Sequence, residues 1–186
     1  MRIAVSGCAG IGKTTLVNAL AASLGIPVIA ENYEPLFGPK GGLKGPLPKL
    51  AEAFLRIHET KRALESRHRD FVTDRCPVDI FHSWLIRGLA TTGKRTDTLF
   101  EQCREQVRQY DLLVFPPWGV LELQQNHEVG VRRAPNPWVQ LRGQTCMIGV
   151  ALQWMDPRRL VHLPAAIDTV EQRVNYVRTA LERSGT

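Results

Sequence analysis

Residues 7–14 read GCAGIGKT, a complete match to the phosphate-loop pattern G-x-x-x-x-G-K-[ST]. The apolar run Ile3-Ala4-Val5 lies just before this stretch, and a helical pattern begins within it. In that context a strand leads into a glycine-rich turn whose backbone N–H groups surround a phosphate. The helix that follows directs the positive end of its dipole at the same anion. The stretch therefore predicts a strand, a loop and a helix that together bind a nucleotide.

The same pattern assigns roles to single residues. We expect Lys13 to reach the β- and γ-phosphates of the nucleotide, and the Thr14 hydroxyl to ligate Mg²⁺. The residues expected to hold the nucleotide are Gly7, Cys8, Ala9, Gly10, Ile11, Gly12, Lys13, Thr14 and Thr15.

The composition is that of one ordinary globular domain. The chain has 186 residues, of which 44% are hydrophobic and 23% are charged. These values fit a single α/β domain over residues 1–186 and do not fit a disordered chain. No apolar stretch approaches the roughly 20 residues that a membrane-spanning helix needs, so we expect a cytoplasmic protein with no membrane partner. The four cysteines lack the spacing of a zinc site or a disulfide framework and are expected to be reduced.

The basic charge leaves two classes of partner open. A formal net charge of +6 and a pI near 9.5 suit either a small anionic substrate or a nucleic acid. Because the cations are scattered along the chain rather than gathered in a run, we favour the small anionic substrate. The sequence does not decide between a monomer and a homodimer.

Hydrophobic periodicity predicts strands that alternate with helices. Strands are expected at residues 3–5, 26–30, 71–74, 112–115 and 160–163. Helices are expected at residues 13–24, 48–67, 78–89 and 138–154, with Asp97 as the cap of a further helix that reaches Tyr110 and with Ile167 as the first apolar residue of the last one. This alternation predicts a parallel sheet covered on both faces, with the ligand at the carboxyl ends of the strands.

Polar residues that follow the strands are therefore the site candidates. Asp74 and Arg75 end the third strand, where the carboxylate can reach the Mg²⁺ shell and the guanidinium can reach an anionic group of the acceptor. Glu31 follows the second strand and is the expected general base, because a carboxylate orients an attacking hydroxyl and accepts its proton. Glu34 is the second choice for that role.

A polar excursion separates the fourth strand from the next helix. Arg132, Arg133 and Arg142 lie in it or just after it. Arginines carried by a closing segment stabilise the negative charge of phosphoryl transfer and exclude water. We therefore expect a lid over about residues 124–145, with Arg132 and Arg133 as its catalytic arginines and Arg142 as a substrate-binding one.

The chain resembles the P-loop kinases of nucleosides and nucleotides. The resemblance is carried by residues 7–15, by Arg132 and Arg133, and by an Asp-Arg-x-Pro-x-Asp stretch that begins at Asp74 and Arg75. The chain is most similar to the small AAA-type P-loop proteins that include ribosylnicotinamide kinases, with thymidylate and deoxynucleoside kinases as relatives. This resemblance implies a P-loop NTPase three-layer sandwich with a five-stranded sheet in the order 2-3-1-4-5. It also implies ATP as donor, Mg²⁺, Asp74 as a metal-side carboxylate and Arg75 as the acceptor-binding arginine.

The leading interpretation is an ATP- and Mg²⁺-dependent kinase for a small nucleoside- or nucleotide-like acceptor. The acceptor stays open, because this chain has Asp74-Arg75-Cys76 where deoxynucleoside kinases usually have Glu-Arg-Ser, and Glu31-Asn32 where thymidylate kinases have an aspartate-arginine pair. The guanine-reading Asn-Lys-x-Asp of GTPases does not occur near the fourth strand, which favours ATP. Two alternatives remain: a kinase for polynucleotide ends, and a nucleotide-dependent switch or ATPase read by a protein partner.

Overall fold

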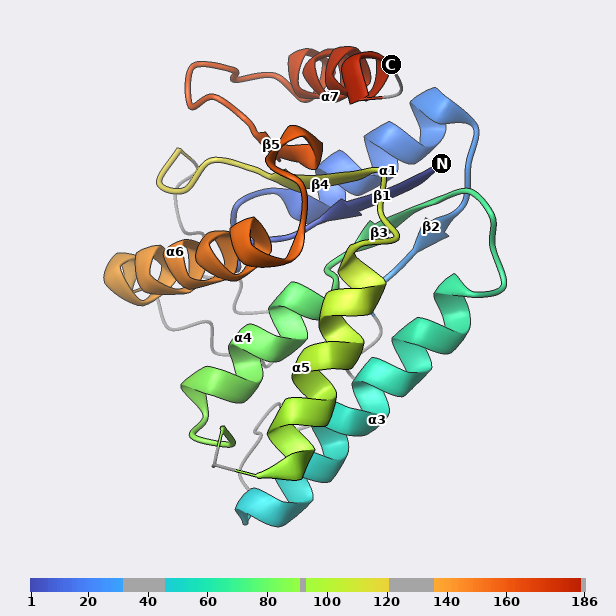
Figure 1. Ribbon diagram of the computed structural model, residues 1–186. Coiled ribbons are helices and arrows are strands. Elements are labelled where there is room, and N and C mark those ends of the chain that lie inside the picture. The colour runs from blue at the N-terminus through green and yellow to red at the C-terminus, as the bar shows by residue number, and fades with distance from the viewer. Residues whose placement is uncertain (32–45, 91–92, 121–135, 185–186) are drawn as a thin grey trace, which may run out of the picture.

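The structure is a computed structural model that describes residues 1–31, 46–90, 93–120 and 136–184. Its centre is a sheet of five parallel strands in the order β2-β3-β1-β4-β5 (Figure 1). This confirms the predicted α/β class and the predicted strand order. The strands are β1 (Arg2–Val5), β2 (Val28–Ile29), β3 (Phe71–Asp74), β4 (Leu112–Phe115) and β5 (Leu160–His162).

Helices cover both faces of the sheet, which makes three layers. In Figure 1, α1 and α7 lie above the sheet, and the other long helices lie below it. The helices are α1 (Lys13–Leu24), α3 (Leu47–Glu65), α4 (Pro77–Ile86), α5 (Lys94–Val107), α6 (Pro137–Trp154) and α7 (Val170–Ser184), with a 3₁₀ turn η2 at Pro157–Arg159.

The core is divided into two parts by the sheet. Along β1, Ile3 and Val5 pack into the cluster under α1 and α7, whereas Ala4 packs into the cluster formed with α3, α4, α5 and α6. Alternate residues of β4 separate in the same way, Leu112 to one cluster and Leu113 to the other. A strand buried on both faces needs apolar residues at every position, which explains the continuous apolar runs in the sequence.

Several predicted helix ends differ from the observed ones. The helix predicted over residues 48–67 is α3, which ends at Glu65, and the one predicted to reach Tyr110 is α5, which ends at Val107. Asp97 does not cap α5: the helix begins at Lys94 after Gly93, and Asp97 lies in its first turn, where a carboxylate is also favoured by the helix dipole. α4 ends at Ile86 rather than at residue 89, because Gly88 adopts a left-handed φ of 68° that ends the helix. Ile167 precedes α7, which starts at Val170.

The sheet brings the candidate residues to one edge. β1 pairs with β3 so that Val5 lies beside Asp74, and the chain leaves β1 directly into residues 7–12. The carboxyl end of β3 and the phosphate loop are therefore neighbours. Among the described helices, none combines the length and the apolar character needed to cross a membrane.

Candidate active site

Residues 7–12 connect β1 to α1 and contain the glycines of the phosphate loop. Gly10 and Gly12 both have a φ of 81°, a left-handed conformation that glycine adopts without strain. Gly12 directly precedes α1, and because glycine has no side chain, the first N–H groups of the helix are not capped by this residue. A helix start of this kind leaves N–H groups available to an anion.

Lys13 is buried at the start of α1, with 6% of its surface exposed. Its Nζ donates a hydrogen bond to the Cys8 carbonyl oxygen at 2.7 Å, across the loop. Burial, followed by the nearby Arg75 guanidinium, lowers the pKa of Lys13 to about 8, against the opposing effect of the neighbouring carboxylates. An ammonium with so little solvent around it interacts more strongly with an anionic ligand than an exposed one does.

Thr14 and Asp74 form a pair beside Lys13. The Thr14 hydroxyl donates to Asp74 Oδ2 at 2.6 Å. The other carboxylate oxygen, Asp74 Oδ1, is buried and has no hydrogen-bond partner among the described residues. A buried carboxylate oxygen without a partner is unfavourable unless a cation or a donor joins it.

The Thr14 hydroxyl oxygen and Asp74 Oδ1 are suited to binding a Mg²⁺ ion. The described residues hold no group of three or more His, Cys, Asp or Glu side chains that would bind a metal by themselves. Mg²⁺ does not need such a group, because it is usually held by one or two protein oxygens together with substrate phosphates and waters. A threonine hydroxyl and a carboxylate with an unpartnered oxygen supply that set.

Arg75 connects the phosphate loop to the end of β2. Its Nε lies 2.6 Å from Glu31 Oε1, and its Nη1 donates to Asp79 Oδ1 at 3.0 Å and to the Gly7 carbonyl oxygen at 3.4 Å. The arginine thus brings Glu31 to the edge of the loop. Both residues were selected from the sequence, but their direct contact was not predicted.

Asp79 fixes the position of Arg75 and of the residues around it through hydrogen bonds from both of its carboxylate oxygens. One of its oxygens, Oδ2, accepts hydrogen bonds from the Ser6 hydroxyl at 2.7 Å and from the Cys76 N–H at 3.0 Å, and Oδ1 accepts from Arg75. Only 3% of Asp79 is exposed. The carboxylate therefore joins the end of β1, the start of α4 and the Arg75 guanidinium.

The expected lid arginines are only partly described. Arg132 and Arg133 lie outside the described residues, as does Glu34, so their roles stay predictions. Arg142 is exposed on α6 and makes no hydrogen bond or ion pair with the described residues. Its charge acts on His82, whose pKa is lowered by burial first and by Arg75 and Arg142 with smaller effect.

Two glutamines on α6 were missed by the sequence analysis. Gln144 Oε1 accepts from the Cys8 N–H at 2.9 Å, and its Nε2 donates to the Pro116 carbonyl oxygen at 3.0 Å. One turn earlier, Gln140 Nε2 donates to the Ala9 carbonyl oxygen at 2.7 Å. A Cβ on Gly7 would lie 2.7 Å from Gln144 Oε1, so the glycine is what allows this close contact.

We predict that Gln144→Leu destabilises the protein by about 1–3 kcal/mol, because a buried N–H and a buried carbonyl lose their partners. The matched control is Gln153→Leu, an exposed position on the same helix, which should change the free energy of unfolding by less than about 0.5 kcal/mol. Urea unfolding of the three proteins measures both values. Equal stability of the two variants would show that Gln144 does not hold the loop.

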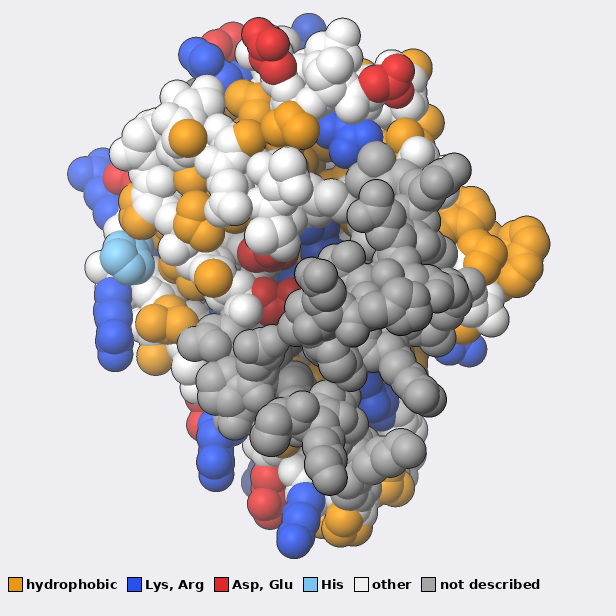
Figure 2. Space-filling view, turned by 180° about the vertical axis from the view of Figure 1, so that it is seen from behind, with side chains coloured by type: hydrophobic (Ala, Val, Ile, Leu, Met, Phe, Trp, Pro, Cys, Tyr) orange, Lys and Arg blue, Asp and Glu red, His pale blue; other side chains and the backbone are white. Residues whose placement is uncertain are grey.

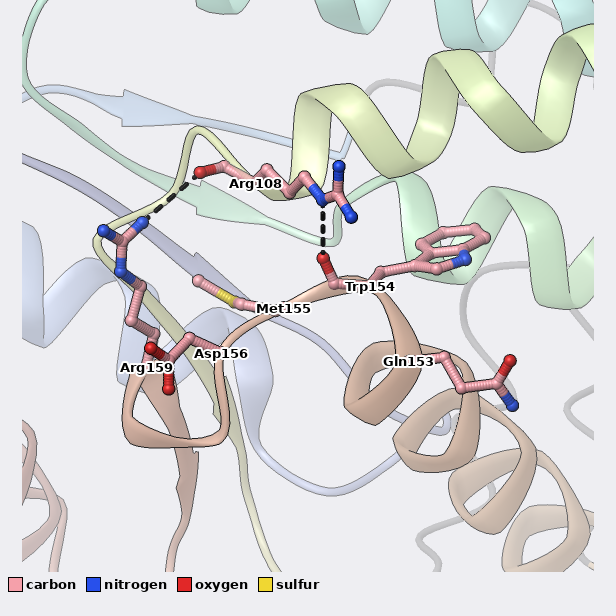
Figure 3. A pocket seen from close by; sticks show the side chains of 6 residues that line it. All are labelled: Arg108, Gln153, Trp154, Met155, Asp156 and Arg159. Atoms are coloured by element: carbon pink, nitrogen blue, oxygen red, sulfur yellow. Dashed lines mark hydrogen bonds between the residues drawn. The ribbon is translucent and has the colours of Figure 1, made fainter.

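A separate crevice lies at the opposite edge of the sheet. It has a volume of about 420 Å³ and is lined by Arg108, Gln153, Trp154, Met155, Asp156 and Arg159 (Figure 3). Its two arginines bind carbonyl groups at helix ends: Arg108 Nε donates to the Trp154 carbonyl oxygen at 3.2 Å, and Arg159 Nη1 donates to the Arg108 carbonyl oxygen at 3.4 Å. Cations at helix carboxyl ends are a structural feature, so we place the candidate site at the phosphate loop.

A family model described as "AAA domain" matches residues 2–140. No curated protein matches the chain. Among solved structures, a deoxyadenosine kinase from M. mycoides with products dCMP and dCDP has a TM-score of 0.67 at 15% identity, covering 98% of this chain and 100% of that one.

Two further structures show the same fold. YorR from Bacillus subtilis, in complex with phosphorylated GDP, has a TM-score of 0.58 at 12% identity and covers 100% of this chain and 98% of that one. Thymidylate kinase from Candida albicans has a TM-score of 0.56 at 12% identity and covers 99% and 92%. The predicted resemblance to nucleoside and nucleotide kinases is thereby confirmed at the level of the fold. Since the family model spans most of the sequence, this chain belongs to the AAA domain family and has the fold of the small P-loop kinases.

Proposed function

We propose that this protein is an ATP- and Mg²⁺-dependent kinase that transfers the γ-phosphoryl group to a hydroxyl of a small nucleoside- or nucleotide-like acceptor. One observation supports this most. A phosphate loop, a hydroxyl–carboxylate pair suited to Mg²⁺ and an arginine–carboxylate pair lie together at the carboxyl ends of neighbouring strands. Transfer from a triphosphate to a hydroxyl needs these three kinds of group side by side.

On the donor side, residues 7–15 would bind the phosphates through backbone N–H groups and through Lys13. The Lys13 ammonium stabilises negative charge that develops on the transferred group. Thr14 and Asp74 would hold Mg²⁺, which supplies charge neutralisation between the β- and γ-phosphates when it is bound. In this arrangement the buried Asp74 Oδ1 would gain the partner that it lacks among the described residues.

On the acceptor side, Glu31 would orient the attacking hydroxyl and accept its proton. Arg75, 2.6 Å from Glu31, would hold that carboxylate in place and contact the acceptor. Arg132, Arg133 and Arg142 are proposed to contact the phosphates or the acceptor from the segment before and within α6. The nucleoside class of acceptor is supported by the similar structures, which are named as kinases of deoxyadenosine and thymidylate.

The polynucleotide-end alternative receives less support. On the face seen in Figure 2, the described Lys and Arg side chains are scattered among acidic and apolar ones rather than gathered into one basic field. A nucleic-acid site normally needs such a field. We accordingly propose a small-molecule partner rather than a nucleic acid. The cytoplasmic location expected from the sequence stays a prediction.

The test is ADP release from Mg·ATP over a panel of nucleosides, nucleoside monophosphates, sugars and oligonucleotides. The proposal expects one or more nucleosides or monophosphates to stimulate release, with a phosphorylated product visible by mass spectrometry. Stimulation by oligonucleotides alone would replace the proposal with a polynucleotide kinase. Slow ADP release that no acceptor changes would replace it with a switch or ATPase.

Nucleotide binding should take up protons near pH 8. Lys13 has a pKa of about 8 in the protein without ligand, and a bound polyphosphate favours its charged form. At pH 8 we expect uptake of about half a proton per ATP, and an affinity that falls by up to about tenfold per pH unit above pH 8. Calorimetry in two buffers of different ionisation enthalpy measures the uptake. The Lys13→Met variant should show none, and an affinity independent of pH between 8 and 9.5 would contradict the assignment.

A further inference from the structure

The peptide that joins Asp74 to Arg75 has an unusual conformation. Arg75 has a φ of 63°, and it is the only described residue other than glycine with a positive φ. A left-handed conformation is unfavourable for a residue with a side chain and persists only where its surroundings enforce it. In this case the peptide separates the proposed metal ligand from the proposed acceptor-binding arginine.

Two hydrogen bonds hold the polar groups on either side of this turn. The Arg75 N–H donates to the Val5 carbonyl oxygen of β1 at 2.9 Å. The Asp74 carbonyl oxygen accepts from Lys61 Nζ at 2.8 Å. Because the N–H and the carbonyl of one peptide are fixed from two different elements, the peptide cannot rotate without breaking both bonds. The left-handed turn at Arg75 follows from this orientation, and the turn directs the guanidinium to Glu31 and Asp79.

Lys61 is an unexpected donor for a backbone carbonyl. It lies on α3 with only 3% of its surface exposed. The acidic residue one turn later, Glu65, is bound instead by the Tyr110 hydroxyl at 2.8 Å and by Gln106 Nε2 at 2.7 Å. The ion pairs among the described residues do not include Lys61 with Glu65, although the charge of Glu65 favours the charged form of Lys61. A buried ammonium is costly, and an apolar side chain of similar length would fill the same space.

We propose that Lys61 is a positioning residue, which fixes the Asp74–Arg75 peptide and through it the direction of the Arg75 guanidinium. The orientation of the Asp74–Arg75 peptide by Lys61 is argued from the described geometry alone. Its effect on phosphoryl transfer rests on the proposed kinase function. Lys61 Nζ binds the Asp74 carbonyl oxygen, so we assign it no direct contact with donor or acceptor. It acts through the orientation of Arg75, and its effect belongs to the acceptor side of the reaction.

The test compares Lys61→Met with Lys49→Met, which removes an exposed lysine from the same helix. In folded Lys61→Met we expect the Arg75 amide to exchange with solvent at least tenfold faster, because the buried Asp74 carbonyl has lost its donor. With an acceptor from the panel, kcat/KM for the acceptor should fall at least tenfold and KM for ATP should change less than twofold. Lys49→Met should leave all of these values unchanged.

A double-variant cycle separates positioning from general stability. In an Arg75→Ala background, Lys61→Met should reduce transfer less than twofold further, because its target is already absent. An undiminished tenfold loss in that background would overturn the proposal. So would unchanged protection of the Arg75 amide in folded Lys61→Met.

Two features keep this test decisive. Lys61→Gln, a shorter polar side chain, is measured in parallel in case the Met variant does not fold, with the same faster exchange expected. The exchange measurement needs no substrate, so it tests the role of Lys61 even if no acceptor on the panel is phosphorylated. Failure of every acceptor would count against the proposed function and not against the positioning role of Lys61.

Discussion

Replacing Lys13 by Met is expected to lower the rate of phosphoryl transfer by at least about a hundredfold, since removal of one preorganised charge that stabilises a transition state costs about 10²–10³ in kcat. Lys13 is suited to that role because its ammonium is buried beside the loop and bound to the Cys8 carbonyl oxygen at 2.7 Å. Methionine is an unbranched side chain one atom shorter, and it removes both the charge and the hydrogen bond to the Cys8 carbonyl oxygen. Steady-state kinetics with the acceptor found in the panel gives the ratio.

The same variant should not lose stability. The pKa of Lys13 is lowered from 10.5 to about 8 in the folded protein. Below pH 8 both folded and unfolded chains carry the charge, so the folded state bears the full net cost of burial and of repulsion by Arg75, reduced by the nearby carboxylates, roughly 3 kcal/mol for a shift of this size. Between pH 8 and 10.5 the unfolded chain binds more protons, so the wild type gains stability as pH rises. Lys13→Met should lack this gain and be at least as stable at pH 7.

A matched control is Lys94→Met, which removes an exposed lysine from the start of α5. It should leave kcat within about twofold of the wild type, because an exposed charge far from the loop is screened by solvent. Full activity in folded Lys13→Met would remove the phosphate-transfer role from this residue. Loss of folding would instead show that its ammonium is structural.

The sequence predicted the sheet well because each strand is recognisable locally. β1, β3 and β4 are buried on both faces, and a buried parallel strand needs an unbroken apolar run. Once alternation with helices implied parallel strands, Asp74 and the phosphate loop had to lie at one edge, and the Thr14–Asp74 bond at 2.6 Å agrees with that placement. Local patterns and one topological rule were sufficient for this part of the site.

The supporting residues were not predictable in the same way. Gln144 contacts Cys8 across 136 positions of sequence, and Ser6 contacts Asp79 across 73. Such contacts depend on how α4 and α6 pack against the sheet, which no local periodicity records. Lys61 was missed for a related reason: a lysine within an amphipathic helix is normally assigned to the exposed face, whereas this one is buried.

Replacing Glu31 by Gln is expected to lower kcat by about 10²–10⁴, the range for loss of a positioned general base. Glutamine keeps the size of the side chain but does not accept the proton of the attacking hydroxyl. KM for ATP should change less than twofold, because Glu31 contacts Arg75 on the acceptor side rather than the phosphate loop. Initial rates at varied ATP and varied acceptor separate the two effects.

Three comparisons decide whether the carboxylate acts as a base or only holds Arg75. Glu182→Gln on the exposed face of α7 is the control for the substitution itself and should retain full activity. Arg75→Ala should raise the KM of the acceptor more than it lowers kcat if, as proposed, the arginine binds the acceptor while Glu31 accepts the proton. If Glu31→Gln reproduces the Arg75→Ala pattern and Glu34→Gln carries the large loss in kcat, the base is Glu34, and the 2.6 Å contact between Glu31 and Arg75 serves binding alone.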